Sequence, residues 1–194
     1  MSQFWFYFGL GKNYILDINS VQHILFVIAV CAVYLLKDWR KVLILLLFFT
    51  FGYSLMLILI AMNIIRIKPE LIQYLIPVTI FITAVSNVLK KQSTYYKKNL
   101  QSNYFLAMFF GLIHGAGFAH YLKNLLISGK PTVMQLVAYN LGIELAHMII
   151  IFLFLIASYL FVNLISVNRR DWNLVISSGI AGIAITIMFE AKYW

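Results

Sequence analysis

Three polar residues recur at helical spacing in an apolar stretch of this 194-residue sequence. Asn140, Glu144 and His147 stand at positions i, i+4 and i+7, so a helix would carry all three on one face. A glutamate and a histidine three residues apart can offer a carboxylate oxygen and an imidazole nitrogen to one metal ion. Alternatively, Glu144 is protonated or paired with a histidine and only fastens two helices together.

Other ionisable residues also lie in apolar surroundings. His114 is central to FFGLIHGAGFAH, residues 109 to 120, and His23 follows Asp17 by six positions. A charge at the centre of a bilayer costs roughly 2.5–3.5 kcal/mol, so such groups are expected to pair or to bind something. Imidazole with carboxylate suits nickel, cobalt or zinc better than magnesium. The candidate metal ligands are His114, Glu144, His147, His23 and Asp17.

Small residues surround His114. Gly111 and Gly115 form a GxxxG pair, and Gly117 adds further small surface, so another helix can approach closely. We expect that approach to bring polar groups of a neighbouring helix within reach of the His114 ring. The hydroxyls of Thr50, Tyr53 and Ser54 beside Gly52 fit either helix packing or the lining of a polar cavity.

The elements that must position these residues are membrane helices. Hydrophobic residues make up 63% of the sequence, charged residues 11%, and the mean hydropathy is +0.90. This composition predicts an all-α, polytopic membrane helix bundle, folded as a single domain over residues 1–194. The six predicted spans cover about 21–36, 42–62, 71–89, 103–122, 139–165 and 173–189.

Two segments depart from a simple span. The fifth apolar stretch begins at Val133, so it is either one long tilted helix or a helix with an interfacial lead-in. The aromatic run from Phe4 to Phe8 predicts a short interfacial or re-entrant segment lying against the bundle.

The distribution of lysine and arginine predicts the orientation. The connections after the first, third and fifth spans carry nine of the 15 basic residues, and the termini with the other connections carry six. By the positive-inside rule the nine-charge side is cytoplasmic and both termini lie outside. The net charge is +9, and the basic residues that produce it border the membrane spans. Anionic lipid headgroups on the cytoplasmic side, rather than nucleic acid, are therefore the expected partners.

The sequence resembles the HupE/UreJ family of small membrane proteins. FGLIHGAGFA (110–119) matches the family's Phe-Gly-Leu-x-His-Gly-x-Gly-Phe-Ala, NLGIE (140–144) its Asn-x-Gly-x-Glu, and HILF (23–26) the tail of its Asp-His-x-Leu-Phe. The resemblance implies a protein of the bacterial inner membrane linked to nickel supply for hydrogenase and urease. Gln22 replaces the family's aspartate, Tyr53 replaces a histidine, and His147 stands where glutamine is more usual.

Three functions are compatible with this pattern. The first is a permease in which His23, His114, Glu144 and His147 bind a divalent cation in transit. The second is an intramembrane zinc hydrolase, although the sequence lacks an HExxH motif, and non-enzymatic roles are favoured. The third is a metal-free subunit or chaperone, associated with other membrane chains or with copies of itself.

Overall fold

The computed structural model describes residues 3–17, 21–90, 100–125 and 131–191, and in these ranges the chain forms helices and turns without a strand. The predicted all-α helical bundle is confirmed. The elements in chain order are α1 (Gln3–Leu16), α2 (Val21–Cys31), the 3₁₀ turn η2 (Leu36–Asp38), α3 (Trp39–Ala61), α4 (Pro69–Val88), α5 (Leu100–Leu125), α6 (Val133–Tyr159), the π-helical turn η4 (Leu160–Leu164) and α7 (Arg169–Glu190).

Five helical segments of the described chain are long and apolar enough to cross a membrane: 36–61, 69–88, 103–123, 133–164 and 169–190. Helices α1 and α2 pass the same test only together, as a pair bent by 70°. This corrects the predicted first span, 21–36, because α2 has 11 residues and ends at Cys31. At 1.5 Å per residue α2 alone cannot cross about 30 Å of hydrocarbon.

Capping residues explain where the later helices begin. The Thr132 hydroxyl accepts a hydrogen bond from the Gln135 backbone N–H (3.3 Å), and Gln135 Oε1 accepts from the Thr132 N–H (2.9 Å). Helix α6 therefore starts at Val133 and continues through η4, which makes the fifth stretch one long helix. Asn168 caps α7 in the same way by accepting from the Arg170 N–H.

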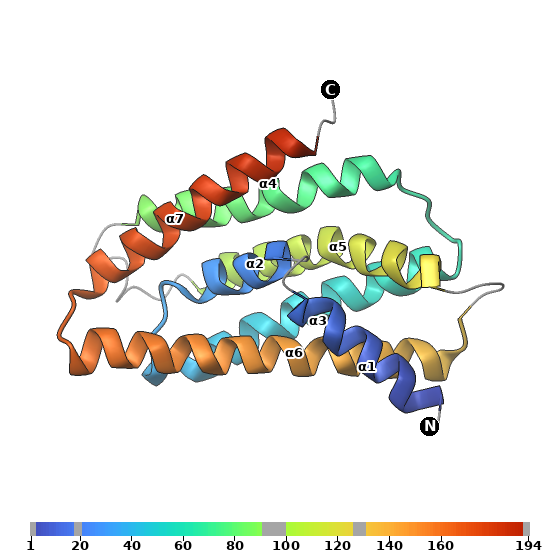
Figure 1. The fold of residues 1–194 in the computed structure, drawn as a ribbon, viewed down its shortest axis with the longest axis horizontal. Coiled ribbons are helices and arrows are strands. Elements are labelled where there is room, and N and C mark those ends of the chain that lie inside the picture. The colour runs from blue at the N-terminus through green and yellow to red at the C-terminus, as the bar shows by residue number, and fades with distance from the viewer. Residues whose placement is uncertain (1–2, 18–20, 91–99, 126–130, 192–194) are drawn as a thin grey trace.

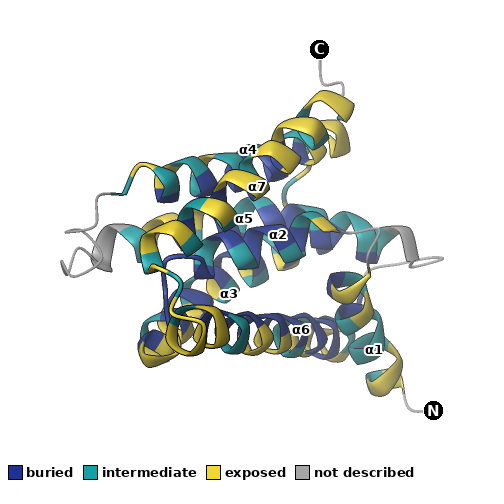
Figure 2. Ribbon diagram, turned by 60° about the vertical axis from the view of Figure 1, so that its left-hand side comes forward, coloured by how far each residue is buried: buried dark blue, intermediate teal, exposed yellow. Residues whose placement is uncertain are grey.

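The helices pack mainly against partners that are distant in sequence. The most extensive contacts join α3 with α5, α1 with α6, and α4 with α7. In Figure 1, α2 and α5 lie between α4 and α7 on one side and α3 and α6 on the other. Figure 2 shows buried residues gathered on α2 and α5, while exposed residues predominate along α7. Two polar residues of these helices, His23 of α2 and His114 of α5, are buried in this interior.

Glycines set the closest of these contacts. A Cβ on Gly111 would overlap the Phe49 carbonyl of α3, and one on Gly115 would overlap the Tyr53 backbone. The predicted close helix approach is confirmed, and the approaching helix is α3. A Cβ on Gly117 would instead meet the Ile76 side chain of α4 at 3.0 Å. Gly11 and Gly142 make an equivalent backbone contact between α1 and α6.

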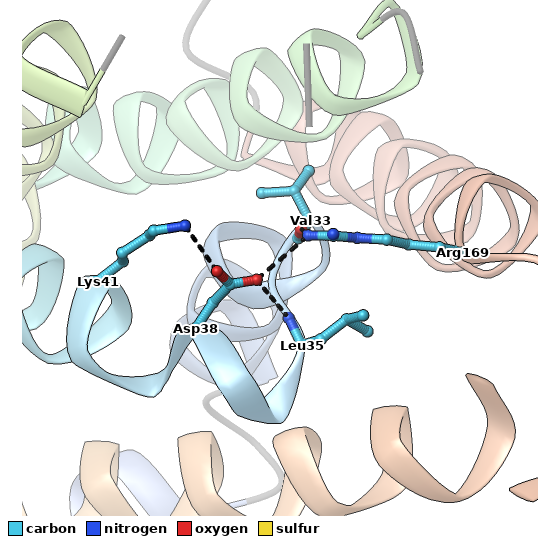
Figure 3. A network of polar contacts seen from close by, with 5 residues as sticks. All are labelled: Val33, Leu35, Asp38, Lys41 and Arg169. Atoms are coloured by element: carbon cyan, nitrogen blue, oxygen red, sulfur yellow. Dashed lines mark hydrogen bonds and ion pairs between the residues drawn. The ribbon is translucent and has the colours of Figure 1, made fainter. Parts of the chain in front are cut away.

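A charged cluster fastens the start of α7 to the connection between α2 and α3 (Figure 3). Lys41 Nζ donates to Asp38 Oδ1 at 2.6 Å, and Arg169 donates to Asp38 Oδ2 at 3.3 Å. Arg169 also donates to the Val33 carbonyl at 2.6 Å. Asp38 is only 9% exposed. This carboxylate therefore joins three segments of the chain, a contact that sequence spacing alone did not indicate.

Candidate functional site

Two histidines meet in the interior where α2 crosses α5. His23 Nδ1 lies 3.4 Å from His114 Nδ1, and both side chains are buried. The outer nitrogens are also bonded: His23 Nε2 lies 3.3 Å from the Tyr14 hydroxyl, and His114 Nε2 lies 3.0 Å from Thr79 Oγ1. Four side chains from α1, α2, α5 and α4 thus form one hydrogen-bonded chain.

The direction of this chain assigns the imidazole tautomers. The Thr79 hydroxyl donates to the Ile76 carbonyl at 2.7 Å, so its oxygen must accept from His114 Nε2–H. His114 Nδ1 then carries a lone pair and accepts from His23 Nδ1–H. His23 Nε2 is left to accept from the Tyr14 hydroxyl. Every link is satisfied with both imidazoles neutral, which suits a site removed from water.

Aromatic rings enclose the histidines and link them to His147. The Phe49 ring centroid lies 5.5 Å from those of both His114 and His147. Phe118 similarly contacts His23 at 4.9 Å and His147 at 6.4 Å. His147 is 1% exposed, and its Nδ1 has no hydrogen-bond partner among the described residues. A buried polar atom of this kind is uncommon in folded proteins.

The predicted shared face of Asn140, Glu144 and His147 is confirmed, and it is directed at α3. Thr50 and Tyr53 both donate to Glu144 Oε2, at 2.6 and 3.0 Å. Ser54 donates to Asn140 Oδ1 at 3.2 Å, and the Tyr53 ring lies against His147. The three α3 hydroxyls therefore serve helix packing. Tyr53, which the resemblance places where a histidine is expected, directs its hydroxyl to Glu144.

The five candidate ligands are not gathered into one site. The structure pairs His23 with His114 and sets His147 behind the same aromatic rings. Asp17 is exposed just past the end of α1, and Glu144 is bonded to α3. Among the described residues, no three of His, Cys, Asp or Glu come together closely enough to hold an ion.

A cavity of about 470 Å³ leads to the histidine pair from one end of the bundle. We call it the His23 cavity. Its walls come from the end of α1, the starts of α2 and α4, and the ends of α5 and α7; they include Tyr14, Gln22, His23, Gln73, His120 and Glu190. The cavity thus connects His23, but not the fully buried His114, to the surface.

Two members of the hydrogen-bonded chain were absent from the predicted site. Thr79 stands two residues after Pro77, and Tyr14 lies within α1. A threonine in a span is most often bonded to its own helix, as Thr83 is to the Thr79 carbonyl at 2.8 Å. Only the packing of α4 on α5 shows that Thr79 also serves His114.

Replacing Thr79 with valine should lower the free energy of unfolding by about 1 kcal/mol, since a buried imidazole N–H between membrane helices loses its acceptor. Thr83→Val is the matched control, because Thr83 bonds only within α4 and should change stability by less than about 0.3 kcal/mol. Denaturation in mixed detergent micelles measures both. Equal effects of the two substitutions would contradict the assigned role of Thr79.

Comparison with known proteins identifies a family. The family model described as HupE / UreJ protein matches residues 1–192, almost the whole chain. No curated protein and no solved structure matches significantly. The long apolar helices and this match establish an integral membrane protein. The chain, with its paired histidines beneath the His23 cavity, belongs to the HupE/UreJ family.

Proposed function

We propose that this protein is a permease for nickel or a similar divalent cation, with His23 and His114 as the first binding site. The HupE/UreJ family is associated with nickel or cobalt transport or with the maturation of metal centres. The observation that carries the proposal is the juxtaposition of two imidazole nitrogens, one of which belongs to His23 in the lining of a cavity that opens to the surface. Imidazole is a good ligand for nickel, cobalt and zinc.

The spacing of the pair suits a shared ion. Two nitrogens bound at about 2.0–2.1 Å to a tetrahedral ion lie about 3.3 Å apart, close to the observed 3.4 Å. Binding requires a lone pair on both Nδ1 atoms. His114 already presents one, and His23 would move its proton to Nε2 and donate to the Tyr14 oxygen in place of accepting. In this proposal a cation binds between the two Nδ1 atoms after one tautomer change, at His23.

His147 is the proposed third imidazole on the path. Its unpaired Nδ1 would gain a partner by binding an ion or its hydrating water. Glu144 and Asp17 lie outside this proposed binding step, because Glu144 is bonded to Thr50 and Tyr53 and Asp17 is exposed. Water would complete the coordination that two or three imidazoles leave open.

The basic residues support an orientation for this path. The His23 cavity lies at the end of the bundle that carries Arg66, Lys68 and Lys123, the side with fewer positive charges. By the positive-inside rule this end faces outward in the inner membrane of a bacterium. The proposed direction of transport is therefore into the cell.

Purified protein should bind Ni²⁺, and His23→Asn and His114→Asn should each weaken binding by at least about tenfold, as expected when a metal loses a ligand. Uptake of Ni²⁺ into proteoliposomes should fall in parallel. Thr186→Ala, on the exposed face of α7, is the control and should bind and transport like the unmodified protein. Unaltered Ni²⁺ affinity in both histidine variants would refute the proposed site.

A metal-free accessory subunit is the second candidate. Its support is that the Tyr14, His23, His114 and Thr79 chain is complete without an ion, and that no three potential ligands converge among the described residues. Elemental analysis of gently purified protein separates the two candidates. Absence of nickel, cobalt and zinc together with stable co-purification of other membrane chains would favour the accessory role.

A further inference from the structure

A second cavity lies at the opposite end of the same helices. It has a volume of about 160 Å³ and is lined by the end of α2 with the turn after it, the end of α4, and the first half of α5, with one residue from α3. Its polar lining residues are Tyr34, Thr83, Ser86, Asn87, Lys90 and Asn103. We call it the Lys90 cavity. Helices α2, α4 and α5 thus wall both cavities.

One face of α4 runs from the first cavity to the second. Ile76 lines the His23 cavity, Thr79 bonds His114, and Thr83 lines the Lys90 cavity. Asn87 and Lys90 continue the same stripe at helical spacing. At 1.5 Å per residue, Lys90 lies about 16 Å along the axis from Thr79. The helix offers hydroxyl and amide oxygens over this distance.

Two phenylalanines separate the histidine pair from the Lys90 cavity. The Phe26 ring centroid lies 4.3 Å from that of His114 and 6.0 Å from that of Phe110. Phe110 lines the Lys90 cavity, and both rings are buried. This apolar layer is thin, since the same Phe26 ring lies near both His114 and Phe110. It closes the structure between the two cavities.

Lys90 is hydrogen-bonded to an amide oxygen in the second cavity. Its amino group donates to Asn87 Oδ1 at 3.2 Å. The Asn87 side chain is fixed by its own donation to the Ala29 carbonyl at 2.7 Å, so Oδ1 is held toward Lys90. Burial lowers the pKa of the Lys90 ammonium, because the charged form loses hydration. The Lys90 ammonium thus places a positive charge against the Asn87 amide oxygen, as a bound metal cation would.

We propose that the Lys90 cavity is the release compartment for the divalent cation held by His23 and His114, and that Lys90 acts as its gate. The ammonium occupies the Asn87 oxygen and repels a second positive charge, so the ion must displace it to leave. This inference rests on the proposed permease function. It adds a second site at the other end of the path and a residue that controls the transport rate.

Removing the gate should accelerate transport. Lys90→Gln should raise the initial rate of Ni²⁺ uptake into proteoliposomes by about threefold, because repulsion between like charges no longer opposes release. Lys90→Arg keeps the charge, so its rate should stay below that of Lys90→Gln. Lys37→Gln, an exposed lysine in the connection between α2 and α3, is the matched control and should change nothing. A Lys90→Gln rate equal to or below the unmodified rate would overturn the gate.

Filling the cavity should separate binding from transport. Ala107 is buried and lines the Lys90 cavity, so Ala107→Phe should reduce Ni²⁺ uptake by about tenfold. Ni²⁺ binding by the purified variant should stay within about twofold of the unmodified protein, which also reports that the histidine pair is intact. Gly182→Phe adds slightly more bulk to open space on α7 and should transport normally.

The outcomes distinguish this inference from the function on which it rests. Full transport by an Ala107→Phe variant that still binds Ni²⁺ would overturn the release compartment while leaving the permease intact. An unmodified protein that neither binds nor transports Ni²⁺ would overturn both. If Ala107→Phe does not fold, the comparison of Lys90→Gln with Lys90→Arg decides alone, because neither adds bulk to the core.

Discussion

Replacing Asp38 with alanine should lower the free energy of unfolding by about 3 kcal/mol, because two cations lose the carboxylate that they share. Arg169 is the more important partner. It is 17% exposed at its side chain and bridges to the Val33 carbonyl, so Asp38 holds the start of α7 against the connection between α2 and α3. Denaturation in mixed micelles, followed by circular dichroism, measures this loss.

Lys41 supplies the matched control for Asp38. Its side chain is 43% exposed, so Lys41→Ala should cost no more than about 0.5 kcal/mol despite the short 2.6 Å contact. The double variant Asp38→Ala, Arg169→Ala should cost less than the sum of the single changes, since one interaction is removed twice. Additive losses for Asp38 and Arg169, or equal losses for Asp38 and Lys41, would contradict this account of the cluster.

Replacing Gly115 with alanine should lower the free energy of unfolding by about 2–3 kcal/mol, the upper range for overpacking. The added Cβ would overlap the backbone of Tyr53, which cannot move aside as a flexible side chain can. Helices α3 and α5 must therefore separate. That separation also displaces His114, the neighbour of Gly115, so Ni²⁺ binding should weaken in the same variant.

Gly179→Ala tests whether the Gly115 effect comes from the backbone contact. Gly179 also lies in a helix, but a Cβ added there meets nothing within 4 Å. Alanine favours helix over glycine, so this control should be neutral or slightly stabilising. Denaturation midpoints of the two variants in the same detergent give the comparison. Similar midpoints would mean that the close approach of α3 and α5 contributes little.

Much of the fold follows from local sequence. The predicted apolar runs agree with most of the observed ends of α3 to α7 to within a few residues. They do so because the cost of burying charge fixes where each run stops. Helical periodicity also places Asn140, Glu144 and His147 on one face, and the glycines around His114 indicate a close contact. These features depend on one helix at a time.

The sequence does not show which helix packs against each helix face, because the main contacts join helices that are distant in sequence. Glu144 has the spacing of a metal ligand, yet its face meets the hydroxyls of α3 and not the histidines. Thr79 looks like an intrahelical hydroxyl until α5 is packed beside it. The bend between α1 and α2 could not be predicted either, since hydropathy gives the length of an apolar segment and not the direction of its helix axis.

The contact of α1 with α6 has a consequence for the order of assembly during translation. Gly11 packs on the backbone near Tyr139, and Gly142 on that of Phe8, so the partner surface of α1 is synthesised about 130 residues later. At about 5–20 residues per second, the ribosome needs roughly 7–26 s to supply it. Helix α1 therefore emerges from the ribosome well before α6, and its packing on α6 can form only after α6 has been synthesised.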